Sequence, residues 1–266
     1  MIANARMYSV NAAAKAAWRE LLAWVTERAS APWDIIDYEA PAPLSALWAR
    51  NDLGCALMCG LPFTLRAPAP LLIAAPVPSK PRYRRRARYM TDLAVRADSP
   101  YRSIEDTFGG NVGFTVTDSQ SGYFALRHFL RPFQQQRGGA LYRSTVGGLL
   151  NARGVIDALA AGKIDVGPLD SYSYDLLTHL EPSYAHQARI IASTEPTAIP
   201  PFVATADLDS DLRARLRQAF AEVESAPDLA DARARLLLTG FEFPSPEDYA
   251  PLRARHDALI AAPEVW

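Results

Sequence analysis

The part of the chain with the clearest capacity for chemistry is a polar stretch at residues 118–123, which reads Asp-Ser-Gln-Ser-Gly-Tyr. A strand predicted at 112–116 leads into it, and a predicted helix follows. The first turn of a helix presents backbone N–H groups and the positive end of the helix dipole, which together attract anions. The hydroxyls of Ser119 and Ser121 would add donors, and Gly122 would let the backbone approach a ligand closely. The alternative is an ordinary N-cap made by one of the two serines.

Two charged residues could contribute to an anion site from elsewhere in the chain. Asp170 follows a strand predicted at 163–169, and its carboxylate could accept a hydrogen bond from a protonated oxyanion or pair with a ligand amine. It could equally cap the helix that follows. Arg153 could donate charge-assisted hydrogen bonds to an anion, or lie on the surface in the first turn of its helix. The sequence leaves both alternatives open.

Residue types used in catalysis are present, but not in catalytic patterns. The histidines lie in predicted helices or surface loops without a matching acid motif: His128, His179, His186 and His256. The chain contains no Gly-x-Ser-x-Gly elbow, Walker loop, dinucleotide fingerprint or cluster with metal-ligand spacing. We therefore expect no catalytic residue, no metal site and no cofactor.

Composition restricts the class of protein. Of the 266 residues, 49% are hydrophobic and 21% charged, and the formal net charge is −1. These values are typical of a globular protein and give no electrostatic basis for binding nucleic acid or an anionic membrane surface. No apolar run approaches the roughly 20 residues of a membrane helix, so we expect no membrane insertion. Cys55 and Cys59 lie on one predicted strand, about 13 Å apart, which predicts buried thiols and no disulfide.

Strands and helices alternate along most of the chain, which predicts an α/β fold with mostly parallel sheets. Helices are expected at 12–28, 44–50, 123–130, from Asn151 to about Gly162, and at 174–180, 210–225, 228–238 and from about 246. Strands are expected at 2–7, 33–38, 53–59, 71–75, 89–95, 112–116, 163–169, 189–192, 202–204 and 241–243. A turn is expected at 60–63 and a loop at 134–139. Two extended crossings, near 90–95 and 193–202, suggest two lobes joined by two strands.

Several segments, in this order, resemble the phosphate/phosphonate-type substrate-binding proteins of ABC transporters. They are Met7-Tyr8, 59–63, 118–123, 162–172 and 194–202. The resemblance implies a two-lobed type II periplasmic-binding-protein fold, with mostly parallel sheets joined by a two-strand hinge. Lobe 1 would comprise 1–92 and 200–266, lobe 2 would comprise 93–199, and the hinge strands would lie near 89–97 and 193–203.

The resemblance also implies roles for particular residues. In this family the Ser-x-Ser-Gly-aromatic turn holds phosphonate or phosphate oxygens, and the matching residues here are Ser119, Gln120, Ser121, Gly122 and Tyr123. Tyr8 and Tyr89 match positions where aromatic side chains face the cleft, and Asp170 matches an acidic position on its far wall. The implied function is capture of a small oxyanion by hinge closure, with an ABC permease as partner.

Two other functions remain open, a cytoplasmic enzyme on the same fold and a ligand sensor that acts through a partner protein. The first residues lack the basic start and apolar stretch of a secretory signal. The sequence therefore predicts a periplasmic protein if an upstream signal has been removed, and a cytoplasmic one if Met1 is the true start.

Overall fold

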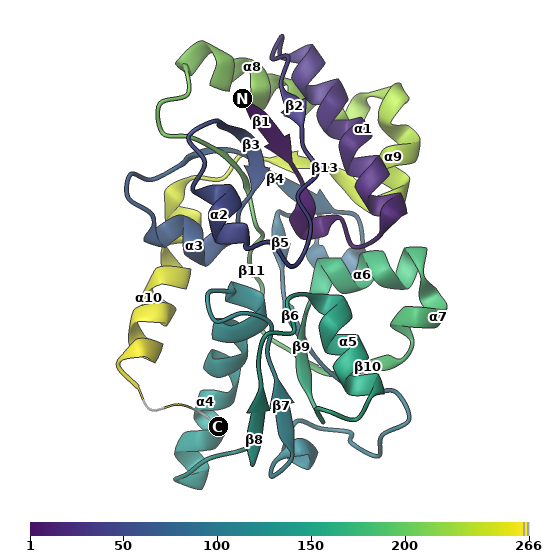
Figure 1. The fold of residues 1–266 in the computed structure, drawn as a ribbon, viewed down its shortest axis with the longest axis vertical. Coiled ribbons are helices and arrows are strands. Elements are labelled where there is room, and N and C mark those ends of the chain that lie inside the picture. The colour runs from purple at the N-terminus through teal and green to yellow at the C-terminus, as the bar shows by residue number, and fades with distance from the viewer. Residues whose placement is uncertain (263, 265) are drawn as a thin grey trace. The chain divides into compact units, whose positions relative to one another are not determined.

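The computed structural model describes residues 1–262, 264 and 266, which form two compact units (Figure 1). Unit 1 comprises Met1–Arg88 and Ala198–Ala250, and unit 2 comprises Tyr89–Thr197 and Pro251–Trp266. The sequence-based division placed all of 200–266 in lobe 1, and the structure differs there, because residues 251–266 belong to unit 2.

The C-terminal helix α10 (Ala250–Ile260) joins unit 2 through its contacts with helix α4 (Ala125–Arg137). The guanidinium of Arg127 donates a hydrogen bond to the backbone carbonyl oxygen of Leu259 at 3.4 Å. These two residues are 132 positions apart. The contact is therefore a tertiary one, which no local sequence pattern indicates.

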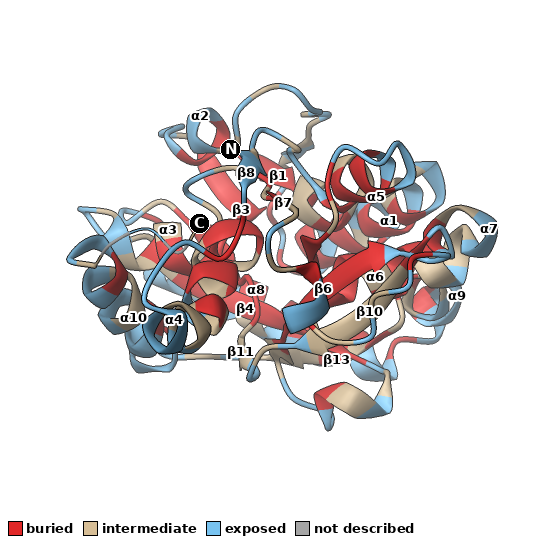
Figure 2. Ribbon diagram, turned by 90° about the horizontal axis from the view of Figure 1, so that it is seen from below, coloured by how far each residue is buried: buried red, intermediate tan, exposed pale blue. Residues whose placement is uncertain are grey.

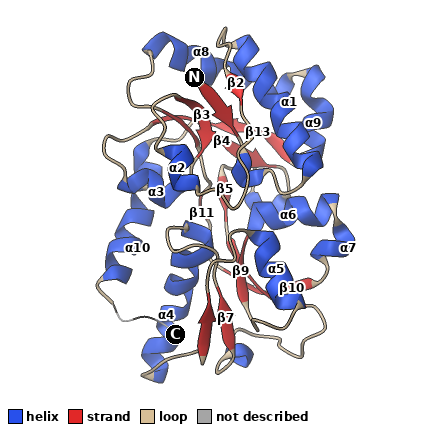
Figure 3. Ribbon diagram, viewed as in Figure 1, coloured by secondary structure: helices blue, strands red, loops and turns tan. Residues whose placement is uncertain are grey.

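Unit 1 is built on a six-stranded sheet in the order β13-β4-β12-β3-β1-β2 (Figure 3). Its strands are β1 (Ile2–Asn4), β2 (Asp34–Ile35), β3 (Leu53–Leu57), β4 (Leu71–Pro78), β12 (Phe202–Ala204) and β13 (Leu238–Glu242). β1 is parallel to β2 and β3, and β12 is antiparallel to both β3 and β4, so β1 to β4 run in one direction. β13 adds antiparallel to β4. The predicted, mostly parallel sheet is confirmed.

The helices of unit 1 are α1 (Ala12–Arg28), α2 (Leu44–Trp48), α3 (Gly60–Leu65), α8 (Ser210–Glu222) and α9 (Ala230–Arg235). α1 has the predicted bounds, because the Asn11 side chain accepts a hydrogen bond from the N–H of Ala14 at 2.8 Å and apolar residues recur on one face. Trp18 on that face is buried, and its ring lies 5.8 Å from the ring of Phe202 in β12. α1 therefore packs against the sheet.

Two predictions for unit 1 are wrong in detail. The turn expected at 60–63 is the start of helix α3, which tolerates Pro62 because first-turn N–H groups have no partner within the helix. The strand expected at 71–75 continues to Pro78, because β13 pairs with its second half. At 60–63 the proline lies in the first turn of a helix, where it is tolerated. At 76–78 the pairing with β13 keeps the prolines within the strand.

The two cysteines are buried free thiols, as predicted. Burial raises the pKa of the Cys55 thiol, because an apolar environment disfavours the charged thiolate. Cys55 is therefore a structural residue of β3 and not a reactive one.

Unit 2 contains two small sheets. Its strands are β6 (Thr91–Arg96), β7 (Asn111–Gly113), β8 (Ser144–Val146), β9 (Gly167–Asp170) and β10 (Ala188–Ser193). β6 lies between β9 and β10 and is antiparallel to both, whereas β7 and β8 are parallel. The chain passes from one unit to the other within β5 (Arg88–Tyr89) and again within β11 (Thr197–Ala198). These two strands pair with each other.

The helices of unit 2 are α4, α5 (Ala152–Ala160), α6 (Ser171–Leu180), α7 (Pro182–Ala185) and most of α10, and a π-helical turn (Gln120–Phe124) precedes α4. A core of side chains from β6, β7, α4 and adjoining loops is buried, and Figure 2 shows β6 coloured as buried along most of its length. Asn151 caps α5 as predicted, accepting the N–H of Gly154 at 3.1 Å. Single 3₁₀ turns in both units lie at Arg6–Tyr8, Pro81–Tyr83, Glu105–Thr107, Val223–Ser225, Pro227–Leu229 and Pro246–Asp248.

Several predictions for unit 2 are also wrong in detail. The strand expected at 112–116 is β7, which ends at Gly113, and the strand expected at 163–169 is β9, which begins only at Gly167. The loop expected at 134–139 is mostly helical, because α4 continues to Arg137 and ends where Gly138 adopts a φ of 74°. The helix expected from Tyr174 begins three residues earlier, at Ser171. Within the described residues, no helix is both long and apolar enough to span a membrane.

Candidate functional site

The polar turn at 119–123 is held by a cap that leaves donors available. Ser119 precedes the π-helical turn in an extended conformation, and its Oγ accepts a hydrogen bond from the N–H of Gly122 at 3.0 Å. The N-cap alternative is therefore observed. A hydroxyl that accepts in this way still has its own proton to donate, so the cap and an anion contact are compatible at Ser119.

Gly122 is required by packing inside unit 2. A Cβ atom at this position would lie 1.8 Å from Oγ1 of Thr115. The N–H of Thr115 also donates a hydrogen bond to the carbonyl oxygen of Gly122 at 3.1 Å. The glycine therefore permits close approach of the turn to Thr115, in the segment that follows β7, whereas the sequence had suggested close approach to a ligand.

Ser121 is anchored by a residue that sequence reasoning missed. Its carbonyl oxygen accepts a hydrogen bond from the side-chain hydroxyl of Thr91 at 3.1 Å. Thr91 is buried at the start of β6, where its N–H donates to Oγ1 of Thr194 at 3.0 Å. The Ser121 hydroxyl has no hydrogen-bond partner among the residues that the structure describes, so it remains available to a ligand.

The same threonine places Asp170 beside the turn. In the antiparallel ladder between β6 and β9, Thr91 pairs with Asp170. Oδ1 of Asp170 accepts hydrogen bonds from the N–H groups of Tyr172 at 3.0 Å and Ser173 at 2.9 Å. Asp170 is thus the cap of α6, which was the alternative interpretation, and its position at the end of β9 brings it near the turn.

The aromatic and amide members of the predicted set are buried. Tyr123 packs with Phe114 at a centroid distance of 5.0 Å and has the guanidinium of Arg127 over its ring at 5.4 Å. Gln120 is 3% exposed, at the first position of the π-helical turn. Both residues support the shape of the turn, and a direct contact with a ligand stays a prediction.

Tyr8 and Tyr89 come from different units. Tyr8 lies in a 3₁₀ turn of unit 1 and Tyr89 lies in β5 of unit 2, and both are buried. Their role as ligand contacts stays a prediction.

Arg153 is engaged inside unit 2. Its guanidinium donates a hydrogen bond to the carboxylate of Glu181 at 2.5 Å and lies 4.7 Å from the ring centroid of Tyr184. The hydrogen bond to Glu181 is the main cause of a raised pKa at Arg153. An anionic ligand would have to compete with Glu181 for this cation, so Arg153 is the weakest member of the predicted set.

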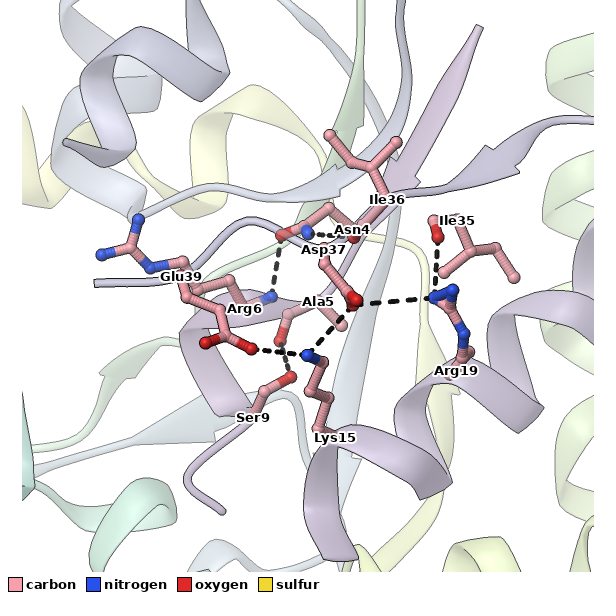
Figure 4. Close-up of polar contacts among 10 residues, drawn as sticks. All are labelled: Asn4, Ala5, Arg6, Ser9, Lys15, Arg19, Ile35, Ile36, Asp37 and Glu39. Carbon is pink, nitrogen blue, oxygen red and sulfur yellow. Dashed lines mark hydrogen bonds and ion pairs between the residues drawn. The ribbon is translucent and has the colours of Figure 1, made fainter. Parts of the chain in front are cut away.

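The end of β1 in unit 1 carries a network of ion pairs (Figure 4). Nζ of Lys15 lies 3.1 Å from the carboxylate of Asp37 and 2.5 Å from that of Glu39, and Arg19 lies 3.7 Å from Asp37. Figure 4 draws no contact between the guanidinium of Arg6 and these carboxylates. Lys15 and Arg19 therefore hold the two acids.

Arg6 is the second residue that sequence reasoning missed. Its guanidinium donates to the backbone carbonyl oxygen of Ala42 and lies 5.3 Å from the ring centroid of Tyr38, and within the described residues it has no ion pair. Burial lowers the pKa of Arg6. The carboxyl ends of parallel strands are the usual ligand-binding edge of an α/β sheet, and Arg6 places a partly desolvated cation there. No pattern of residue types marks it in the sequence.

The arrangement around the turn suits hydrogen bonding to an anion. Among the described residues, no His side chain or carboxylate is hydrogen-bonded to the hydroxyls of Ser119 and Ser121. The described residues also contain no group of three or more His, Cys, Asp or Glu side chains placed to hold a metal ion.

Comparison with protein families matches residues 9–249 to the model described as ABC transporter, phosphonate, periplasmic substrate-binding protein. The chain belongs to this family. The resemblance inferred from the sequence is thereby confirmed. No curated protein sequence matches the chain significantly.

Solved structures support the same fold. PhnD1 from Prochlorococcus marinus, in complex with methylphosphonate, matches with a TM-score of 0.77 at 12% identity over 98% of this chain and 99% of that one. A binding-protein component of an ABC phosphonate transporter from Pseudomonas aeruginosa matches with a TM-score of 0.76 at 17% identity, over 96% and 85% of the two chains. The alkanesulfonate-binding protein SsuA from Xanthomonas axonopodis pv. citri, bound to MOPS, matches at 0.58 and 19% identity over 98% and 92%.

At these identities the solved structures establish the fold, and that fold is the predicted type II periplasmic-binding-protein fold. The phosphonate-binding family consists of substrate-binding components of ABC transporters. Neither comparison assigns a role to individual residues of the turn at 119–123.

Proposed function

We propose that the protein is a solute-binding protein that captures a small oxyanionic ligand, phosphonate-like or phosphate-like, for an ABC permease. The observation that carries the proposal is the link from Thr91 to Ser121 on one side and to Asp170 on the other. It holds the backbone of Ser121 at the start of a helical segment, and the cap on the N–H of Gly122 holds the hydroxyl of Ser119 in the same turn. Oxyanions bind such positions because several donors and the helix dipole act together.

In this proposal the ligand lies against the turn of unit 2 and is enclosed when unit 1 closes over it. Pairing of β5 with β11 at two of the three chain passages supports a hinge there. From unit 1, Tyr8 would supply an aromatic surface and Arg6 a cation. The names of two similar structures, one with methylphosphonate and one an alkanesulfonate-binding protein, support a tetrahedral oxyanion as ligand class.

We propose no chemical step on the ligand, because the hydroxyls of the turn have no base within hydrogen-bonding distance among the described residues. Asp170, already accepting two backbone N–H groups, would accept a proton shared with a protonated oxyanion. It would act as a specificity contact, since a fully deprotonated dianion would be repelled by its carboxylate.

The test is calorimetric titration of the protein with methylphosphonate, phosphate, methanesulfonate and acetate. We expect at least one tetrahedral oxyanion to bind, and Ser121→Ala to weaken it roughly tenfold or more through loss of a charge-assisted hydrogen bond. Ser210→Ala is the matched control, because Ser210 is exposed on α8 in unit 1. Absence of binding by all four anions, or equal effects of the two substitutions, would reject the proposal. Conversion of a bound ligand in ³¹P NMR would favour the enzyme alternative.

A further inference from the structure

A pocket lies within unit 2, between α4, α10 and the segment that joins β10 to β11. Its volume is about 410 Å³. It is lined by Gln120, Phe124, Ala125, His128, Phe129, Pro132, Phe133, Ser193, Thr194, Glu195, Thr197 and Arg255. This volume lies within the range of small-molecule sites in proteins. Of the residues predicted to hold the oxyanion, it includes Gln120 alone.

One wall of the pocket is apolar and aromatic. Phe124, Phe129, Pro132 and Phe133 all belong to α4 or the turn before it, and the rings of Phe129 and Phe133 lie 5.9 Å apart. Phe129 lies three and four positions before Pro132 and Phe133, which places these three on one side of α4. Such a wall stabilises the apolar body of a ligand by removing it from water, which an inorganic oxyanion cannot exploit.

The polar side of the pocket carries a cation without a counter-ion. The guanidinium of half-buried Arg255 has no hydrogen bond or ion pair within the described part of the chain. His128 lies close enough that the charge of Arg255 contributes to lowering the His128 pKa, after the larger effect of burial. Arg255 and His128 come from α10 and α4, so the two helices together present a positively charged group beside the aromatic wall.

Glu195 restricts the charge that the ligand can carry. Glu195 also lines the pocket, and its carboxylate has no hydrogen-bond partner among the described residues. A ligand with two negative charges would meet Arg255 with one of them and be repelled by Glu195. A single anionic group is the charge that fits both residues.

We propose that this pocket binds a small monocarboxylate with an aromatic body, its carboxylate on Arg255 and its ring against Phe129 and Phe133. A carboxylate matches a guanidinium through two parallel hydrogen bonds. The aromatic body fills the remaining volume against the α4 wall. The proposal is independent of the oxyanion function, because the contacts it invokes, Arg255, Phe129 and Phe133, are not among the residues proposed to hold the oxyanion.

The test is titration with benzoate, phenylacetate and 3-phenylpropionate, with benzyl alcohol as the uncharged comparison. We expect at least one acid to bind, more tightly than the alcohol, and Arg255→Gln to weaken it roughly tenfold or more. Phe129→Ala is a second variant that shortens the apolar wall. Thermal melting of each variant establishes that it is folded.

Arg253→Gln is the matched control, because Arg253 lies on the same helix but pairs with Asp257 at 2.9 Å and does not line the pocket. It should leave acid binding unchanged. Failure of all three acids to bind, or equal losses in Arg255→Gln and Arg253→Gln, would overturn the proposal. Loss of acid binding in Ser121→Ala would place the acid at the oxyanion turn and would also overturn it, whereas failure of the oxyanion titration alone would leave it intact.

Discussion

The side-chain hydroxyl of Thr91 donates a hydrogen bond to the backbone carbonyl oxygen of Ser121 across 3.1 Å, from a position where Thr91 is 2% exposed. This contact joins the first residue of β6 to the turn that we propose as the oxyanion site. The position of the Ser121 backbone therefore depends on a strand residue that lies 30 positions earlier in the chain.

Thr91→Val tests this dependence, because valine keeps the shape of threonine and removes the donor. We expect the free energy of unfolding to fall by about 1–3 kcal/mol, since a partly buried carbonyl group loses a partner. Oxyanion affinity should fall as well, because Ser121 is no longer held. Chemical denaturation and calorimetry measure the two effects.

Thr178→Val is the matched control for this variant. Thr178 also donates from its hydroxyl to a backbone carbonyl, that of Tyr174 at 2.8 Å, but within α6. It should leave oxyanion affinity unchanged. If both substitutions alter affinity equally, Thr91 has no particular role in the turn.

Gly122→Ala should destabilise unit 2 by about 1–3 kcal/mol through overpacking, because the new Cβ would lie 1.8 Å from Oγ1 of Thr115. Combining it with Thr115→Gly removes the opposing side chain. The loss of stability in the double variant should be smaller than the sum of the two single losses, measured by urea unfolding. Simple additivity would show that the contact between these two residues does not limit the turn.

The helices that the sequence predicted well are those with local signals at both ends. α1 and α5 begin after Asn11 and Asn151, whose side chains accept hydrogen bonds from backbone N–H groups three residues on. The family resemblance likewise rests on short segments that can be recognised in order along the chain. Fold class could therefore be predicted before any tertiary contact was known.

The remaining features depend on contacts between distant residues. Thr91 is one of many threonines in strands, and only the register of β6 with β9 and its bond to Ser121 give it a role. The membership of 251–266 in unit 2 depends on packing of α10 on α4. In the same way, Arg153 has the residue type of an anion ligand, yet Glu181 pairs with it from a position 28 residues away.

Arg153→Met decides whether that arginine has a structural or a ligand-binding role. Loss of a partly exposed ion pair and of a stacked ring contact should lower the free energy of unfolding by about 1 kcal/mol. Oxyanion affinity should stay within twofold of the unaltered protein. A tenfold loss of affinity would instead support Arg153 as a direct contact.

His128 should make stability depend on pH. Its pKa in the folded protein is lowered from 6.5, mainly by burial and further by the charge of Arg255. Glu195 and His128 line the same pocket, and His256 of α10 packs on Phe124, the last residue of the π-helical turn before α4. Below pH 6.5 the unfolded chain binds a proton at His128 more readily than the folded chain does, so unfolding is favoured as the pH falls. The contribution of His128 is fully present above pH 6.5 and is lost as the pH falls towards the folded pKa.

The measurement is the denaturation midpoint between pH 5 and 8 for the unaltered protein, for His128→Gln and for His186→Gln. The His128 variant should lose less stability on acidification than the unaltered protein, because glutamine does not titrate. His186 is exposed and does not line the pocket, so its variant should follow the unaltered protein. Benzoate bound at Arg255 would offset the charge that disfavours protonated His128, so it should reduce the acid sensitivity of the unaltered protein. If His128→Gln shows the same pH dependence as the unaltered protein, the proximity of His128 to Arg255 has no consequence for stability.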